Sequence, residues 1–339
     1  MGQLRNTKMG RYLEERFHKS EREGLYLLPG SEAERKALEL RVRSGEVGVP
    51  WPGMFARATY LESLGYAPRT KARHVLRTYA KRHPGVVFCS FSAAVMHGLW
   101  VPKALVERIY TLSEPGGSST RDVAARSRGA SVKVVRRSCK GCSVVEVDGC
   151  HVTDVDSTLF ECALASSLSQ SLPMLDCALR YELTTKERLL KFVHRYGKGR
   201  HGKCRALEAV DYADGASENG GESTVRGLII ELGYVQPADL QVEFEDPVDF
   251  GKTIRVDGVW HLENGACVIE EVDGLDKYRD EASVTGWSLE AIVRVRQRES
   301  HITALGYPVM RIQYARIGEE GYLEGLLRGF GIPKRVNAE

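Results

Sequence analysis

Residues 253–274 read TIRVDGVWHLENGACVIEEVDG, and the pattern of this stretch determines how the C-terminal part of the chain folds. Two runs rich in β-branched and aromatic residues, Thr253–His261 and Ala266–Asp273, predict strands. The polar residues 262–265 between them (Leu-Glu-Asn-Gly) predict a tight turn. The stretch therefore predicts a β-hairpin.

Four carboxylates lie on the two predicted strands of this hairpin. Because side chains alternate along a strand, Glu271 and Asp273 share one face, whereas Glu270 points to the other. If the two strands pair, Asp257 lies beside Glu271 and an acidic cluster forms. Clustered buried carboxylates repel one another unless a cation joins them. Mg²⁺ or Mn²⁺ suits an all-oxygen site, so metal-assisted phosphodiester chemistry is the first hypothesis.

Further elements are predicted on either side of the hairpin. Upstream, Thr224–Leu232 has helical character and ends at Gly233, the usual C-terminal stop. Downstream, Ser288–Leu305 predicts a helix rich in arginine, and Val309–Tyr314 predicts a short apolar strand. The order in this part of the chain is helix, strand, strand, strand, helix, strand.

A series of short motifs accompanies these elements: Glu222-Ser-x-x-Arg226, Arg255-x-Asp257, Glu271-x-Asp273-Gly274 followed by Lys277-Tyr278, Arg298-Glu299, and Leu305-Gly-Tyr-Pro-Val-Met-Arg311. In order and spacing they resemble the PD-(D/E)XK nuclease superfamily, specifically its very-short-patch-repair-like (Vsr-like) endonuclease domains. The resemblance covers residues 218–330. It implies a restriction-endonuclease-like core, in which a mixed sheet is flanked by helices.

The resemblance also implies an active site. Glu222, Asp257 and Glu271 correspond to the family's metal ligands and would hold Mg²⁺ or Mn²⁺. Asp273 adds a further carboxylate, but it stands where the superfamily has a lysine. Lys277 is the nearby ammonium that would replace that lysine. The predicted catalytic set is therefore Asp257, Glu271, Asp273 and Lys277.

The charges are distributed unevenly along the chain. Residues 1–205 carry 35 Lys/Arg and 20 Asp/Glu, whereas residues 206–339 carry 13 and 25. One interpretation is that the basic front part holds a polyanion and the acidic rear part awaits cations. The other is that the two parts attract each other. The acidity of residues 206–339 argues against a nuclease, because domains that bind DNA are usually basic.

The front of the chain predicts a helix followed by a β-ribbon. Ser31–Val42 has helical composition, and residues 44–57 predict two strands around a Pro/Gly turn. This order is that of the closing half of a winged helix-turn-helix, with Arg41, Arg43 and Arg57 placed to contact phosphates. The alternative is a small helix–hairpin subdomain whose arginines are solvated.

The middle of the chain has a second resemblance. Residues 83–99, HPGVVFCSFSAAVMHGL, are similar to the central part of AbiEi-type antitoxin proteins, which combine a winged helix with an α/β domain. The resemblance spans most of residues 33–330. Further along, Lys198, Arg200 and Lys203 form a basic loop suited to phosphate, and Arg298 on the downstream helix would hold another phosphate.

The eight cysteines are scattered, and no disulfide framework is expected. Only Cys139 and Cys142 have metal or redox spacing, and Cys150 with His151 is close enough to complete a zinc set. A second regularly spaced pair, which a strong zinc signature would show, is missing from the sequence. A β-hairpin with incidental cysteines is the favoured interpretation.

The chain is therefore predicted to be an α/β protein of three parts: a winged-helix-like region at residues 1–69, a middle AbiEi-like α+β domain at 70–210, and a nuclease-like domain at 218–330. The first predicted function is divalent-metal-dependent cleavage of DNA in a defence or mobile-element context. The alternative is a non-catalytic DNA-binding transcriptional regulator, the antitoxin of a toxin–antitoxin system with a cognate toxin protein as partner. The sequence contains neither a run of 18 apolar residues nor an N-terminal signal core, so a cytoplasmic location is expected.

Overall fold

The computed structural model describes residues 7–65, 67–113, 123–127, 130–139, 141–273 and 289–335. The chain forms two compact units, Met1–Cys162 and Ala163–Glu339. The division falls within one helix, α6 (Val155–Ala165). Both units combine helices with β-sheet, so the predicted mixed α/β class is confirmed.

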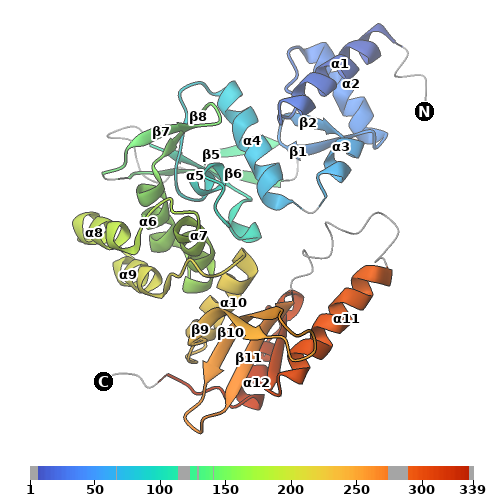
Figure 1. Ribbon diagram of the computed structural model, residues 1–339. Helices are drawn as coiled ribbons and strands as arrows, with labels where there is room; N and C mark the ends of the chain where they lie inside the picture. Colours follow the sequence, from blue (N-terminus) through green and yellow to red (C-terminus); the bar gives the residue numbers. More distant parts are fainter. Residues whose placement is uncertain are drawn as a thin grey trace. The chain divides into compact units, whose positions relative to one another are not determined.

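The first unit begins with two helices and a hairpin, drawn in blue in Figure 1. The elements are α1 (Lys8–Arg22), α2 (Glu32–Arg43), β1 (Val47–Trp51), β2 (Met54–Arg57) and the short helix α3 (Ala58–Ser63). Thr7 and Ser31 cap the two long helices through their hydroxyl groups. The predicted helix followed by a β-ribbon is confirmed. A small core holds these elements together: Leu13, Phe17, Leu27, Leu38, Val47 and Phe55.

The rest of the first unit is a mixed six-stranded sheet with helices. Its elements are α4 (Pro68–Arg82), β3 (Val87–Phe88), α5 (Ser90–Met96), η1 (Lys103–Leu105), β4 (Ile109–Leu112), β5 (Val123–Ser127), β6 (Ala130–Arg137), β7 (Val144–Val147) and β8 (Cys150–Thr153). The strand order is β5-β6-β4-β3-β8-β7, with β4 parallel to β6 and β3 parallel to β8.

The second unit opens with four helices: α7 (Leu168–Arg180), α8 (Lys186–Tyr196), α9 (Lys203–Tyr212) and α10 (Gly220–Glu231). Helix α10 packs tightly on α7, since a Cβ placed on Gly227 would lie 2.4 Å from Ser169 Cα. The segment between α9 and α10, predicted as a linker, is also anchored. Its Asp214 N–H donates to Asp176 on α7 at 2.8 Å. The division into three domains stays a prediction, but α7, α8 and α9 lie in the same unit as the hairpin.

A four-stranded sheet completes the second unit. It contains β9 (Asp239–Glu245), β10 (Thr253–His261), β11 (Cys267–Asp273) and β12 (Val309–Gln313), followed by η3 (Tyr314–Arg316) and α12 (Tyr322–Gly329). The order is β12-β11-β10-β9. Strands β9, β10 and β11 are antiparallel, and β12 runs parallel to β11 after the crossover helix α11 (Leu289–Ala304). The predicted hairpin and the predicted order of elements are confirmed.

Helices cover both faces of this sheet (Figure 1). On one face, α10 and α12 enclose a core with the sheet that includes Trp260, Val268 and Val272. On the other face, Ile302 of α11 packs on Ile269 and its neighbours. Within the described residues, every helix is too short or too polar to cross a bilayer.

Candidate metal centre

The predicted acidic site lies at the point where β10 and β11 separate. The last pair of their ladder on this side is Gly258↔Glu270. One residue further, the carboxylate of Asp257 accepts a hydrogen bond from the backbone N–H of Val272 at 2.8 Å. The aspartate side chain thus joins the two strands and is itself fixed by β11.

The regular alternation of β10 breaks beside Asp257. Ile254, Val256 and Val259 all belong to the core on the α11 face, although alternation places Val256 and Val259 on opposite faces. Across from this break on β9, Gln241 has a left-handed backbone with φ +52°. A break in the alternation of a strand, as in a β-bulge, changes the direction in which the neighbouring side chains point. Here the break lets Asp257 reach Gln241 and, through it, the α10 side of the sheet.

Glu222 joins the same site from the first turn of α10. Asn219 caps the helix, because its side-chain oxygen accepts from the Glu222 N–H at 3.2 Å. The Glu222 carboxylate accepts from the Glu218 N–H at 2.8 Å and from the Gln241 amide at 3.0 Å. The same amide nitrogen lies 3.5 Å from Asp257 Oδ1. One glutamine therefore links the two carboxylates.

Glu270 points to this side as well. It is 4 % exposed and lies on the same face of β11 as Val268 and Val272, which belong to the core on the α10 side. Burial raises the pKa of Glu270 to about 8, and the negative charges of Asp257 and Glu222 add to that rise. Its Oε1 atom has no hydrogen-bond partner in the part of the chain that the structure describes.

Glu271 lies on the opposite face, where α11 packs. Arg298 holds both of its oxygens, with Nη1–Oε2 at 2.6 Å and Nη2–Oε1 at 3.1 Å. Burial raises the pKa of Glu271, and the ion pair with Arg298 works against that rise. The hairpin hypothesis placed Glu271 with Asp257 and Glu270 away from them. In the structure Glu271 has a guanidinium partner, and the negative charge of Asp257 still acts on it to raise its pKa. Glu270 lies on the α10 side of the sheet, on which Glu222 is carried.

The other members of the predicted catalytic set are less defined by contacts. Asp273 is half-buried at the end of β11, and its Oδ1 lies 3.7 Å from Arg311 Nη1. Burial raises the pKa of Asp273, while the charge of Arg311 lowers it. Lys277 and Tyr278 lie outside the described residues.

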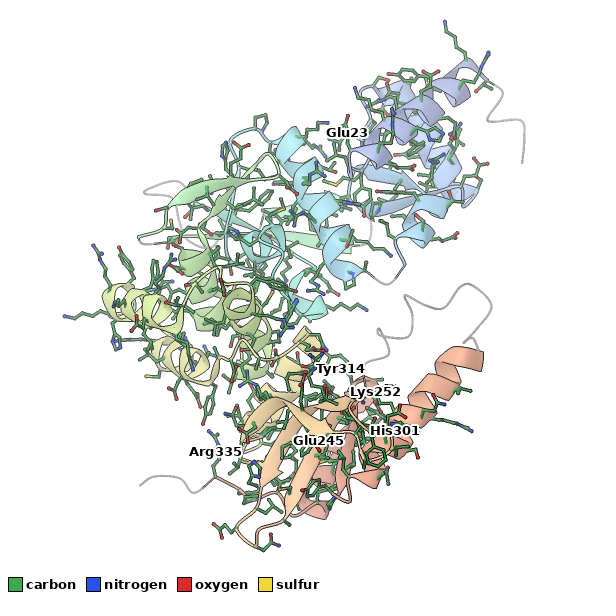
Figure 2. All side chains as sticks on the ribbon, in the orientation of Figure 1. Glu23, Glu245, Lys252, His301, Tyr314 and Arg335 are labelled. Carbon is green, nitrogen blue, oxygen red and sulfur yellow. The ribbon has the colours of Figure 1, made fainter. Side chains whose placement is uncertain are left out.

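A second acidic group lies where β9 turns into β10. Asp246, Asp249 and His301 place their ligand atoms within 4.8 Å of one another. Among the described residues, Glu222 and Asp257 do not reach this compactness with either Glu271 or Glu270. Asp246 accepts from His301 at 2.8 Å, and Asp249 pairs with Lys252 at 2.9 Å, close to the His301 and Lys252 labels of Figure 2. Contacts between the β9–β10 turn and α11 therefore hold Asp246, Asp249 and His301 together.

The motif Glu222-Ser-x-x-Arg226 has a packing role in addition. Arg226 is 2 % exposed, and its Nη2 donates to Asp176 on α7 at 2.6 Å. Arg226 Nη1 donates to the Gln236 side chain at 3.1 Å and to the Tyr212 carbonyl. The motif therefore fastens the helix that carries Glu222 to α7.

The basic residues predicted to contact phosphates in the first unit differ in access. Arg41 is buried and pairs with Glu14 at 3.1 Å. Arg57 pairs with Glu21, and its Nη1 lies 3.5 Å from the same Glu14. Arg43 alone of the three has an exposed side chain. Two of the predicted phosphate contacts are thus engaged within the fold.

In the second unit, the predicted basic loop joins α8 to α9. Lys198 is exposed, whereas Arg200 and Lys203 are half-buried. Arg298, the fourth predicted phosphate contact of this unit, is 46 % exposed although it holds Glu271. Lys198 and Arg298 therefore present their charge to solvent most fully.

The predicted zinc residues are not gathered at one point. Cys142 lies against Cys139, with its Sγ 3.6 Å from the Cys139 carbonyl. Cys150 lies instead in the field of Asp148 and Arg73, at the β7–β8 turn. Among the described residues, the four predicted ligands do not form a compact metal-binding group. The cysteines of this hairpin therefore lack the arrangement of a four-ligand zinc site.

The sequence does not predict two residues of the site, Gln241 and Glu270. Gln241 depends on a left-handed backbone that its residue type does not announce. For Glu270 the signal is Gly258, the residue without a side chain that faces it across the hairpin. Comparisons of the chain with protein-family models, with curated proteins and with solved structures give no match.

Proposed function

We propose that this chain is a divalent-metal-dependent DNA endonuclease whose second unit has a restriction-endonuclease-like core. The order α10-β9-β10-β11-α11-β12 and the mixed sheet agree with what the motif resemblance implies. One observation carries the proposal: Asp257 and Glu222 share the amide of Gln241 where β10 and β11 separate. Two buried carboxylates this close to each other repel, and a bound cation would offset that repulsion.

The donor atoms of this site suit Mg²⁺ or Mn²⁺. Carboxylate oxygens come from Glu222 and Asp257, and Glu271 is the third ligand that the resemblance implies. A bound divalent ion supplies an activated water and stabilises negative charge on the scissile phosphate. The residues of the chain fix the ligand positions, because Asp257 is held by Val272 and Glu222 by the cap of α10.

Other residues would position the DNA. Arg298 has a partly exposed guanidinium beside Glu271, where it is placed to pair with a backbone phosphate. Asp273 is the half-buried acid at the end of β11, and Lys277 is the ammonium that the resemblance assigns to the same reaction. Arg43 and Lys198 are exposed cations suited to hold the duplex. The reaction would take place in the cytoplasm, on DNA in a defence or mobile-element context.

The test is DNA cleavage by the purified full chain. Supercoiled and linear DNA are incubated with Mg²⁺ or Mn²⁺, with wild type, with the double variant Asp257→Ala/Glu271→Ala, and with Glu263→Gln in the exposed hairpin turn as control. We expect metal-dependent cleavage that the double variant loses and the control keeps. Cleavage that persists in the double variant would refute this assignment of the active site.

A DNA-binding regulator is the second candidate, and one observation favours it. Arg298 occupies both oxygens of Glu271, the arrangement expected of a site that no longer needs that carboxylate for a metal. On this hypothesis the nuclease-like fold is a scaffold, the N-terminal helix and ribbon form a winged helix on an operator, and a toxin protein is the partner. Salt-sensitive DNA binding without cleavage, unchanged in the double variant, would support it.

A further inference from the structure

The starting point is a buried carboxylate that the fold leaves unsatisfied. Glu270 is 4 % exposed, and its Oε1 has no hydrogen-bond partner among the described residues. Buried polar atoms without a partner are rare, because each one forfeits its hydration without compensation. A buried carboxylate oxygen without a donor indicates a site for a ligand when other carboxylate oxygens lie on the same side of the sheet.

Space for this carboxylate is built into the neighbouring strand. Gly258 is its cross-strand partner, and a Cβ at that position would lie 2.7 Å from Glu270 Oε2. The same Cβ would also lie 3.0 Å from Pro237 Cβ, so a side chain here has nowhere to move. Gly258 therefore leaves open the volume that the Glu270 carboxylate occupies.

The nearby acids converge on the same side of the sheet. Glu270 shares one face of β11 with Val268 and Val272 of the core under α10, the helix that carries Glu222, and Gln241 links Glu222 to Asp257. The guanidinium of Arg226, on the same helix as Glu222, binds Asp176 at 2.6 Å. Three buried carboxylates thus lie on this side of the sheet, and the arginine of α10 is committed to Asp176. A divalent cation is the ligand that such an arrangement fits.

We propose that Glu270, with Glu222 and Asp257, forms the cation site of this protein, and that Glu271 serves as the partner of Arg298 instead. The inference deepens the proposed function, because it concerns the same site and replaces one of its ligands. Glu270 contributes the unfilled Oε1, and Gln241 links the other two carboxylates to each other. Glu271 instead binds the Arg298 guanidinium and so holds α11 against the sheet.

The test is Mn²⁺ binding by the 339-residue chain without DNA. Binding is measured by calorimetry and by electron paramagnetic resonance, which detects the Mn²⁺ that remains free. Four proteins are compared: wild type, Glu270→Gln, Glu271→Gln and the control Glu263→Gln. Glu270→Gln keeps the shape of the side chain, and circular dichroism melts establish that each variant is folded. We expect Glu270→Gln to weaken Mn²⁺ binding by at least about tenfold, since even residues around a metal ligand cost that much. Glu271→Gln should weaken it clearly less than Glu270→Gln does, and Glu263→Gln in the exposed hairpin turn should leave it unchanged.

The opposite ranking of the two variants, or equal affinity for Mn²⁺ in wild type and Glu270→Gln, would overturn the inference. Absence of Mn²⁺ binding by wild type would overturn it together with the nuclease. Parallel cleavage assays separate the two proposals. Mn²⁺ binding through Glu270 in a protein that cuts no DNA keeps the cation site and removes the nuclease. Metal-dependent cleavage that depends on Glu271 but not on Glu270 keeps the nuclease and removes the inference.

Discussion

Replacement of Glu270 by glutamine tests the electrostatic cost of the site in the absence of metal. Burial and the charges of Asp257 and Glu222 raise the pKa of Glu270 from 4.5 to about 8. The unfolded chain therefore releases this proton near pH 4.5, whereas the folded chain keeps it until about pH 8. Stability linked to Glu270 is complete below pH 4.5 and is lost as the pH rises toward 8.

The size of the effect follows from the two pKa values. One pH unit between them corresponds to about 1.4 kcal/mol, so wild type loses about 4 kcal/mol of folding free energy between pH 4.5 and pH 8. Glu270→Gln has no proton to lose and should escape that loss. At pH 5 the amide replaces a carboxyl group that is protonated in the folded protein, so the two proteins should have similar stability. At pH 8 the variant should be the more stable by several kcal/mol.

The assay is urea unfolding at pH 5 and pH 8 in EDTA, monitored by fluorescence of tryptophan, including Trp260 at 2 % exposure in the second unit. Glu263→Gln, an exposed acid in the turn of the same hairpin, is the matched control and should follow wild type. If Glu270→Gln showed the same loss of stability from pH 5 to pH 8 as wild type, the carboxylate would not be a destabilising buried acid. The electrostatic description of the site would then fail.

Three further variants test the packing around the site. Asp176→Asn leaves Arg226 buried without its carboxylate and should cost about 3–5 kcal/mol in urea unfolding, whereas a change below 1 kcal/mol would mean that the pair is solvated. Gly258→Ala forces a Cβ against Glu270 and should cost about 1–3 kcal/mol, seen as a lower melting temperature; an unchanged melting temperature would contradict the close contact. Asn219→Ala removes the cap of α10 and should cost about 1 kcal/mol by the same measurement, with Glu263→Gln as the unaffected comparison.

The sequence predicts the hairpin and its neighbours because local patterns determine them. Alternating apolar residues in Thr253–His261 and a polar turn determine β10 and β11, and Ser288–Leu305 closely matches α11. The start of α10 was harder to predict. Thr224–Leu232 was expected, but the helix begins at Gly220, because Asn219 caps it through its side chain.

The directions of the acids were not predictable from period two alone. Strict alternation assigns Glu271 to the Asp257 side, but after the break in β10 the Asp257 carboxylate binds the Val272 N–H and reaches Gln241. Gln241 of a third strand lies across from that break, and no local sequence pattern contains this tertiary contact. Arg298 likewise finds Glu271 only because α11 crosses that face of the sheet. Long-range packing therefore determines the chemistry of this site.

The contact between α10 and α7 has a practical consequence for dissecting the protein. A fragment starting at residue 218, where the nuclease-like domain is predicted to begin, would lack α7 altogether. Gly227 would then face water where Ser169 now packs, and the guanidinium of Arg226 would lose Asp176. The helix that presents Glu222 would lose its support in such a fragment. A fragment that keeps the acids together with the support of α10 therefore begins ahead of Leu168, and a shorter fragment would test the loss of this neighbour together with the acidic site.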